Sequence, residues 1–453
     1  MFKSNLFLII LICSACNQAI PYEGEEYVFK NVSLITMSDT EVLENQTVVI
    51  RGDSIFHIGA YDPGEKVAII DGSGKYLMPG LTEMHAHIPV AEDSNDTLVK
   101  ETLFLYLSQG VTTIRGMLGD PYHLSLKQLI EEDEIRSPRV YTSSPSVNGG
   151  TVKTQEEAVE KVTQYQKDGY DFLKIHPGIR AEVWDVIEAT AKDVGIPYAG
   201  HVPVEVGIHR ALEASYKTVD HLDGYMGGLI PEGQEFDKDG GGFFGYGFTD
   251  IVDQDLIKDL VAKTKAQGVA VVPTQTLFTR WFSPEDPAKM LQEPEMQYMP
   301  SKTRFAWRQN KERIIGNEDY NEATWQKYIE IRKALLKEMD KQGVTILLGS
   351  DAPQVMNVPG FSIHHEMAAM VDAGISNRKV LESGTIGPAQ FFDVERDHGK
   401  IAIGASADLV LLDADPLVNI KNTNTVSGVM VRGKWLSKEK IDARLQAIAK
   451  RNR

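Results

Sequence analysis

The chain has 453 residues, 42% of them hydrophobic and 25% charged, which is an ordinary composition for a globular protein. Its formal net charge of -17 supplies no basic stripe, so we expect no nucleic-acid partner. The length allows two or three domains, or one barrel with a satellite domain.

An export signal is predicted at residues 1–16. Lys3 provides a positive flank, and the apolar run 6–13 is too short to span a bilayer permanently. Residues 13–16 resemble a bacterial lipobox, in which Cys16 would carry the lipid; Cys13 stands where leucine is usual, and a simple cleaved signal peptide is the alternative. Both cysteines lie here, so the body has no disulfide framework. We expect an exported protein, periplasmic or at the cell surface, anchored to a bacterial membrane only through Cys16.

Short β-like runs follow near the N-terminus and return near the C-terminus. They cover residues 27–35, 47–51, 54–58, 67–70, 407–412 and 428–432. A hairpin is indicated at Gly52-Asp53, and a helix is expected over 438–449. We predict that residues 27–79 and 395–440 form one small β-sandwich domain that encloses the rest of the chain.

From Gly80 onward, short apolar strands alternate with helical segments. The expected strands are 81–85, 111–115, 139–142, 171–175, 198–201, 218–221, 269–273 and 345–348. Eight such units are typical of an α/β fold, the (β/α)8 TIM barrel, which we predict over residues 80–394.

The connection between the last two of these strands is unusually long, from about 277 to 346, and rich in aromatic residues. It contains a predicted helix at 321–341, with Gly343 just past its end. We interpret this connection as a lid or substrate wall, with a decorative helical insertion as the alternative. The glycine-rich loop 223–250 is expected to be mobile.

Six polar residues stand at the C-terminal ends of the predicted barrel strands, or just beyond them. They are His85, His87, Lys174, His201, His221 and Asp351. Together they offer four imidazoles, one carboxylate and one amine that can become a carbamate, a complete donor set for two divalent metal ions that share a ligand. Such a pair makes hydroxide from water at neutral pH and polarises a carbonyl or phosphoryl oxygen.

The motifs around these residues resemble the amidohydrolase superfamily of metal-dependent hydrolases. Pro79-Gly80-Leu81 followed by His85-Ala86-His87 is similar to the first strand of that family. Further similar motifs follow in the family's order at residues 110–115, 171–175, 199–203, 219–222, 347–352 and 399–410. The similarity covers nearly the whole chain after residue 27, and it is strongest to the imidazolonepropionase-like and Xaa-Pro dipeptidase-like branch, the binuclear type with a carboxylated lysine.

The resemblance implies how the two metal ions are shared. His85, His87 and Asp351 would bind the more buried ion, and His201 and His221 would bind the second. The ions are expected to be Zn²⁺, although mixed imidazole and oxygen donors also suit manganese and cobalt.

Lys174 would be carboxylated by carbon dioxide and would bridge the two ions. A free lysine, with a pKa of about 10.4, is cationic and cannot ligate a metal; burial beside two dications favours the neutral amine and then the carbamate. Asp351 would also be the catalytic base, accepting the proton of the attacking hydroxide and returning it to the leaving nitrogen.

The expected activity is hydrolysis of an amide or peptide-type C–N bond in a small-molecule substrate, such as a dipeptide or an N-acyl amino acid. A lactonase or phosphotriesterase-type hydrolase and a non-catalytic barrel scaffold are the alternatives. Deamination is less favoured, because deaminases of this fold usually use one metal and lack the bridging lysine. A homo-oligomer is compatible with the resemblance, since relatives are often dimers or larger.

Other polar residues receive weaker interpretations. Arg115 is expected in a structural salt bridge, with a substrate carboxylate as the alternative partner. His123, His176 and Tyr225 follow barrel strands and are minor candidates for substrate contact. Residues 364–366 are interpreted as packing or helix-start groups.

Overall fold

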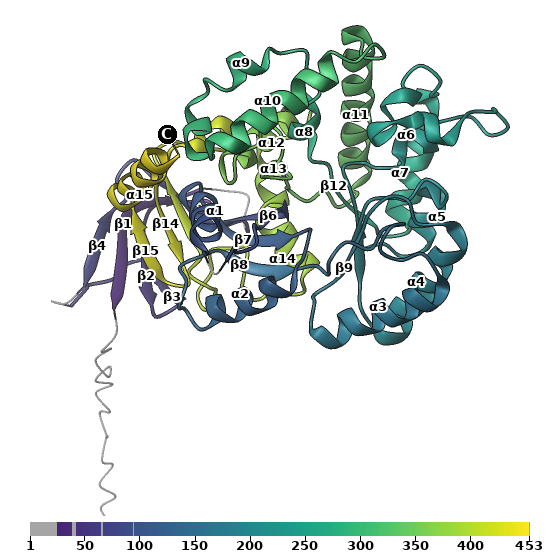
Figure 1. Cartoon of the computed structure of the whole chain (residues 1–453). Coiled ribbons are helices and arrows are strands. Elements are labelled where there is room, and N and C mark those ends of the chain that lie inside the picture. The colour runs from purple at the N-terminus through teal and green to yellow at the C-terminus, as the bar shows by residue number, and fades with distance from the viewer. Residues whose placement is uncertain (1–24, 39–41, 65–66, 94, 453) are drawn as a thin grey trace, which may run out of the picture.

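The computed structural model describes residues 25–38, 42–64, 67–93 and 95–452 (Figure 1). The predicted export signal, with Cys13 and Cys16, lies outside these residues. Within the described ranges, no helix has the length and apolar character that crossing a bilayer requires.

One eight-stranded sheet joins the two ends of the chain. Its order is β15-β14-β13-β5-β1-β2-β3, with β4 beside β1. The strands are β1 (Glu26–Leu34), β2 (Leu43–Arg51), β3 (Ser54–Ile58), β4 (Ala68–Asp71), β5 (Tyr76–Pro79), β13 (Leu409–Leu412), β14 (Val426–Val431) and β15 (Lys434–Ser437). Figure 1 shows the purple N-terminal and yellow C-terminal strands side by side. The two-layered sandwich form stays a prediction.

Two strands of this sheet were not expected from the sequence. In the sequence, the four residues of β5 are not separable from the strand that follows them. In the structure they form a strand because they pair parallel with β1 and antiparallel with β13. The chain reverses at Arg432 and Gly433, which both have positive φ, so β15 pairs back on β14. Both strands depend on partners that lie far away or across a tight turn.

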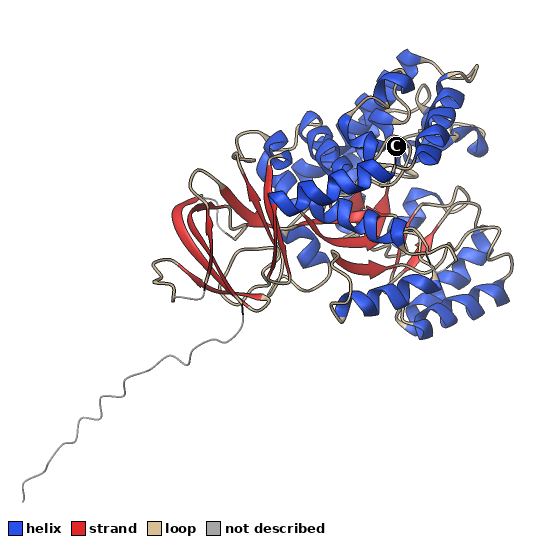
Figure 2. Cartoon of the chain, turned by 60° about the vertical axis from the view of Figure 1, so that its left-hand side comes forward, coloured by secondary structure: helices blue, strands red, loops and turns tan. Residues whose placement is uncertain are grey.

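The central part contains two parallel sheets with helices around them, as Figure 2 shows. One has the order β6-β7-β8 and the other β12-β11-β10-β9. The strands are β6 (Leu81–Ala86), β7 (Val111–Gly116), β8 (Arg139–Thr142), β9 (Leu173–Ile175), β10 (Tyr198–Gly200), β11 (Thr218–Asp220) and β12 (Ala270–Val272). The predicted mixed α/β class is therefore confirmed.

The expected strand at 345–348 is wrong as a strand. Leu347 N–H donates to Val271 O, and Met84 N–H donates to Leu348 O, so this segment does link β12 to β6. However, Leu348 N–H turns away to Ser383 O, and only Ile346 forms a β-bridge. The ladder is too short to count as a strand because the donors and acceptors of this segment are divided among three partners, Val271, Ser383 and Met84.

Helices lie between consecutive parallel strands in the chain, and three more follow segment 345–348. They are α1 (Thr97–Ser108), α2 (Pro121–Glu131), α3 (Gln155–Asp168), α4 (Ala181–Val194), α5 (Gly207–Glu213), α6 (Tyr225–Gly228), α7 (Ile257–Ala266), α12 (Phe361–Asp372), α13 (Asn377–Ser383) and α14 (Ile386–Phe391). Short 3-10 turns are η1 (Lys238–Gly241), η2 (Phe243–Phe248), η3 (Gln254–Leu256), η4 (Pro294–Tyr298) and η5 (Ile420–Asn424). The chain ends with α15 (Lys438–Arg451).

The long connection after β12 folds into α8 (Gln275–Arg280), α9 (Pro287–Met290), α10 (Ser301–Ile315) and α11 (Glu322–Gln342). Helix α11 has the predicted bounds within one residue at each end. The Asn321 side chain accepts from the first backbone N–H groups, and Gly343 closes the helix in a left-handed conformation. The buried Lys311 ammonium donates to Arg280 O and Ser283 O, which fixes α10 against the end of α8.

Candidate metal centre

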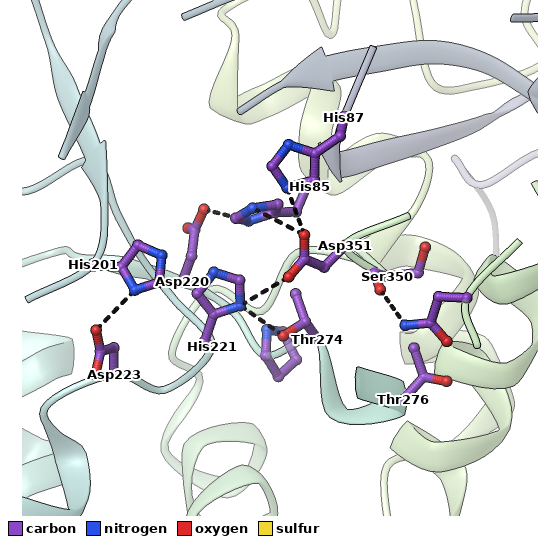
Figure 3. A network of polar contacts seen from close by, with 12 residues as sticks. His85, His87, His201, Asp220, His221, Asp223, Thr274, Thr276, Ser350 and Asp351 are labelled. Atoms are coloured by element: carbon purple, nitrogen blue, oxygen red, sulfur yellow. Dashed lines mark hydrogen bonds and ion pairs between the residues drawn. The ribbon is translucent and has the colours of Figure 1, made fainter. Parts of the chain in front are cut away.

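Asp351 and two of the predicted histidines form a tight group (Figure 3). His87 Nε2 lies 2.7 Å from Asp351 Oδ1, and His85 Nε2 lies 3.6 Å from the same oxygen. One ligand atom from each of the three residues falls within 4.8 Å of the others. The end of β6 with the residue after it, and the segment after Leu348, therefore bring these three side chains to one place.

The second histidine pair lies beside the first. The ring centroids of His201 and His221 are 4.7 Å apart, and those of His221 and His85 are 4.5 Å apart. His221 Nδ1 is 3.8 Å from Asp351 Oδ2. The Asp351 carboxylate thus lies between the two imidazole pairs, although Asp351 follows His221 by 130 residues in the chain.

Lys174 is on β9, with 1% of its surface exposed. Its Nζ has no hydrogen-bond partner among the described residues. Burial lowers its pKa to about 8, and its charge contributes to the lowered pKa of both His85 and His221. The side chain passes Gly200, where an added Cβ would lie 3.1 Å from Lys174 Cδ and 2.5 Å from Ile175 O. The structure therefore brings all six predicted donors into one neighbourhood.

Three residues here have left-handed backbone conformations that L-residues seldom adopt. The φ angles are 65° at His221, 45° at Thr274 and 61° at Asp351. Hydrogen bonds hold two of these turns, because His221 N–H donates to Val272 O and Asp351 N–H donates to His85 O. Local strain of this kind gathers at functional sites.

The Nδ1 atoms of three imidazoles each have a polar neighbour, which sequence reasoning missed. Asp220 Oδ2 lies 2.7 Å from His85, Asp223 Oδ2 lies 3.0 Å from His201, and Thr274 Oγ1 lies 2.9 Å from His221. Metal-binding histidines commonly use their second nitrogen in this way, which fixes the ring orientation and tautomer. The acidic residues on either side of the His221-Leu222 pair were the available signal for two of them.

A match across most of the chain decides the family: residues 76–436 fit the amidohydrolase family model. The chain belongs to the amidohydrolase family. The resemblance seen in the sequence is thereby confirmed. The protein is a hydrolase that acts on C–N bonds, in a family whose members typically bind divalent metal ions.

Named relatives of this amidohydrolase include two deaminases. The chain is 24% identical over 426 residues to the 5-methylthioadenosine/S-adenosylhomocysteine deaminase of Caldanaerobacter subterraneus subsp. tengcongensis, covering 87% of this chain and 86% of the relative. It is 34% identical over 110 residues to the enzyme of the same name from Thermoanaerobacter pseudethanolicus, covering 23% and 25%.

Solved structures share the fold. A Xaa-Pro dipeptidase with methionine bound in its active site superimposes with a TM-score of 0.64 at 19% identity, covering 91% of this chain and 100% of that one. Bottromycin amidohydrolase gives a TM-score of 0.67 at 22% identity, covering 93% and 90%.

Two buried ionisable residues of the amidohydrolase, Arg115 and Glu83, support the first imidazole pair. Arg115 donates to both carboxylate oxygens of Asp220, at 3.3 and 3.2 Å, and to Met84 O at 2.7 Å. Arg115 therefore forms a structural salt bridge with Asp220. Glu83 accepts from the backbone N–H groups of His85 and Ser350. Burial raises the pKa of Glu83 to about 8.

The other candidates divide between the centre and the protein body. His176 stacks on His201 at 5.0 Å between centroids, with its Nδ1 2.7 Å from Ser146 Oγ. His123 is buried with Nε2 3.3 Å from Pro89 O, and the buried Tyr225 hydroxyl bonds to Thr264. Of these three, His176 is the one whose ring stacks on a donor of the centre in the described part of the chain.

His364 and Glu366 make structural hydrogen bonds outside the donor set. His364 Nδ1 lies 2.9 Å from Thr423 Oγ1 and serves packing. Glu366 accepts from the backbone N–H groups of Gln275 and Thr276, directly after Thr274. Burial raises the pKa of Glu366 to about 7.

Arg332 of α11 reaches the turns that carry the second histidine pair. Its fully buried guanidinium donates to His221 O at 2.7 Å, to Pro273 O at 2.9 Å and to Gln275 Oε1 at 2.8 Å. The long helix is therefore fastened to the backbone that orients His221 and Thr274.

Replacing Arg332 by methionine is expected to weaken metal binding at the second histidine pair by about 10- to 100-fold, as loss of an orienting partner typically does. Equilibrium dialysis followed by elemental analysis measures it. Arg308→Met, which removes only an exposed pair with Glu312, is the matched control. Two ions bound with wild-type affinity in Arg332→Met would contradict the positioning role.

Proposed function

We propose that this amidohydrolase cleaves an amide or peptide-type C–N bond of a small substrate, a dipeptide or an N-acyl amino acid, with the help of two divalent metal ions. We further propose that β6 to β12 and segment 345–348 make one (β/α)8 barrel whose strand ends carry the site. One ion would be held by His85, His87 and Asp351. The other ion would be held by His201 and His221, and carboxylated Lys174 would bind both ions.

The observation that carries this proposal is the buried amine of Lys174, close to the imidazoles and Asp351 and without a hydrogen-bond partner among the described residues. A buried ammonium without a partner is costly, and a pKa lowered to about 8 makes the neutral amine accessible. Neutral amine is the form that reacts with carbon dioxide, and the resulting carbamate is an anion suited to two cations. The donor set therefore fits a bridged metal pair.

The imidazoles also fit. Burial is the largest cause that lowers the pKa of His85 and His221 well below the ordinary value, so both rings are neutral, which is the ligating form. Their mixed nitrogen and oxygen donor set suits zinc, our preferred ion, and also manganese or cobalt.

When bound, such ions lower the pKa of water towards about 7 and polarise a carbonyl oxygen. The chain's own catalytic group is Asp351, held by its N–H bond to His85 O and facing both histidine pairs. Its carboxylate takes the proton of the attacking water and delivers it to the leaving nitrogen, which gives a carboxylic acid and an amine.

Deamination is the second candidate, because a relative that aligns over most of this chain is named a deaminase. It would use the same attack of water on a carbon bonded to nitrogen, with ammonia as the leaving group. The buried Lys174 supports the amide reaction, for which a bridged metal pair is proposed. Lactone and phosphotriester hydrolysis, and a scaffold role, stay as alternatives.

Metal analysis combined with a substrate panel tests the proposal. We expect two ions per purified chain and chelator-sensitive release of amino acids from N-acyl amino acids or dipeptides. Ammonia release from purine nucleosides would instead support a deaminase activity. Turnover of lactones or phosphotriesters alone would show that the enzyme hydrolyses a C–O or P–O bond and not a C–N bond. A folded protein that binds no metal and turns over no substrate would favour the non-catalytic scaffold role.

Export, the lipid anchor at Cys16 and a homo-oligomeric state are also proposed, on the sequence alone. Fractionation of cells that express the full chain should place it with membranes, and Cys16→Ser should release it. Recovery of the unchanged precursor in the cytoplasm would contradict export.

A further inference from the structure

A glycine-rich loop lies over the second histidine pair. It runs from Phe236 to Thr249 and includes Gly240, Gly241, Gly242, Gly245 and Gly247. The Phe244 ring lies 5.7 Å from the His201 ring at an interplanar angle of 26°, and 5.2 Å from the His221 ring at 58°. An aromatic face therefore borders the two imidazoles that the proposed function assigns to the second ion.

This placement of Phe244 is held by the long connection after β12. Tyr328 of α11 donates its hydroxyl to Phe244 O at 3.0 Å, and the Phe278 ring meets the Phe244 ring edge-on at 5.0 Å. Phe244 has φ 53°, a left-handed conformation that is uncommon outside glycine, between Phe243 and Gly245. Two separate elements thus fix a residue whose backbone conformation alone would not be favoured.

Aromatic rings continue away from the centre. Phe243, which is 51% exposed, lies 6.1 Å from Trp281 and 6.0 Å from Phe282, and Phe282 stacks on Phe278 at 5.7 Å. Phe244 therefore belongs to an aromatic cluster, of which Phe243 reaches the surface.

Two buried guanidinium groups near the histidines are already engaged. Arg115 is bonded to Asp220 and Arg332 to backbone oxygens of the turns, as described above. Neither guanidinium therefore has a free pair of N–H donors for the carboxylate of a bound substrate. An apolar group of the substrate is better matched to this wall than a charged one.

We propose that Phe244 is a specificity-determining residue, whose ring forms the apolar wall of the substrate site. It selects substrates that carry an aromatic or branched apolar side chain beside the scissile C–N bond over substrates with a charged side chain there. The reason is that a charged group packed on Phe244 would lose water without gaining a partner, whereas an apolar ring gains contact area. This inference rests on the proposed function.

The test compares N-acetylphenylalanine with N-acetylaspartate in the metal-loaded wild type and in Phe244→Ala. We expect the wild type to prefer the apolar substrate, and the variant to lose about 10- to 100-fold in kcat/KM for it, mainly through KM. For N-acetylaspartate the change should stay within about threefold. Phe244→Leu should restore part of the preference, because it returns apolar area.

Phe305→Ala removes a ring that is 61% exposed on α10 and serves as the matched control. Metal content and thermal unfolding show whether Phe244→Ala is folded and loaded. An equal loss for both substrates, or a wild type that prefers N-acetylaspartate, overturns the inference while leaving the proposed function intact. If the wild type cleaves no N-acyl amino acid or dipeptide, the proposed function itself fails.

Discussion

Lys174→Ala is expected to lower kcat/KM by about 10²- to 10³-fold and to abolish stoichiometric binding of two ions. Metal assistance is worth several kcal/mol of transition-state stabilisation, and the variant lacks the amine that is proposed to become the carbamate. Steady-state kinetics and elemental analysis of the purified variant measure both effects. Near-normal activity with two bound ions would refute the assignment of Lys174.

Lys311 provides a matched control, because it is a second buried lysine whose pKa burial lowers to about 8. Its Nζ donates to Arg280 O and Ser283 O, whereas Lys174 Nζ has no hydrogen-bond partner in the described part of the chain. Lys311→Met should therefore lower thermal stability but leave metal content unchanged. In metal-free protein, Lys174→Met should not lower stability, because no hydrogen bond is lost.

The same amine predicts how pH affects loading of metal-free protein. With a pKa of about 8, about half of Lys174 is neutral at pH 8 and roughly 3% at pH 6.5, and the neutral form alone accepts carbon dioxide. Reconstitution with metal and bicarbonate should therefore be faster as the pH rises through this range. An unchanged rate at both pH values would argue against carboxylation.

Asp351→Asn is expected to lower kcat by about 10²- to 10⁴-fold, the range for loss of a general acid–base group. The amide keeps the shape of the side chain but cannot take the proton, and it loses a charge that faces His85, His87 and His221. We expect weaker metal binding as well, seen by elemental analysis beside the kinetics.

Asp250→Asn is the control for this change, because its carboxylate is 71% exposed and forms a surface ion pair with Lys327. It should behave as wild type. An Asp351→Asn enzyme with near-normal kcat at saturating metal would show that another group moves the proton.

Short-range patterns in the sequence were enough for several elements. The bounds of α11 followed from Asn321, the apolar spacing and Gly343, which all act within one helix. The six candidate donors were identified because each stands at the C-terminal end of an apolar run or directly after it, and parallel strands bring such ends together. The family followed from the order of the same motifs.

Tertiary structure decided what depends on residues far apart in the chain. Thr274 reaches His221, Arg332 holds His221 O, and Phe244 lies over His201, and no local spacing encodes these contacts. The left-handed turns at His221 and Asp351 persist only because distant backbone groups bond to them. The chemical groups that this amidohydrolase offers could be identified from the sequence, since residue types and strand periodicity are local properties. Their orientation, support and apolar wall were decided by the packed fold, since those depend on contacts between segments that meet only after folding.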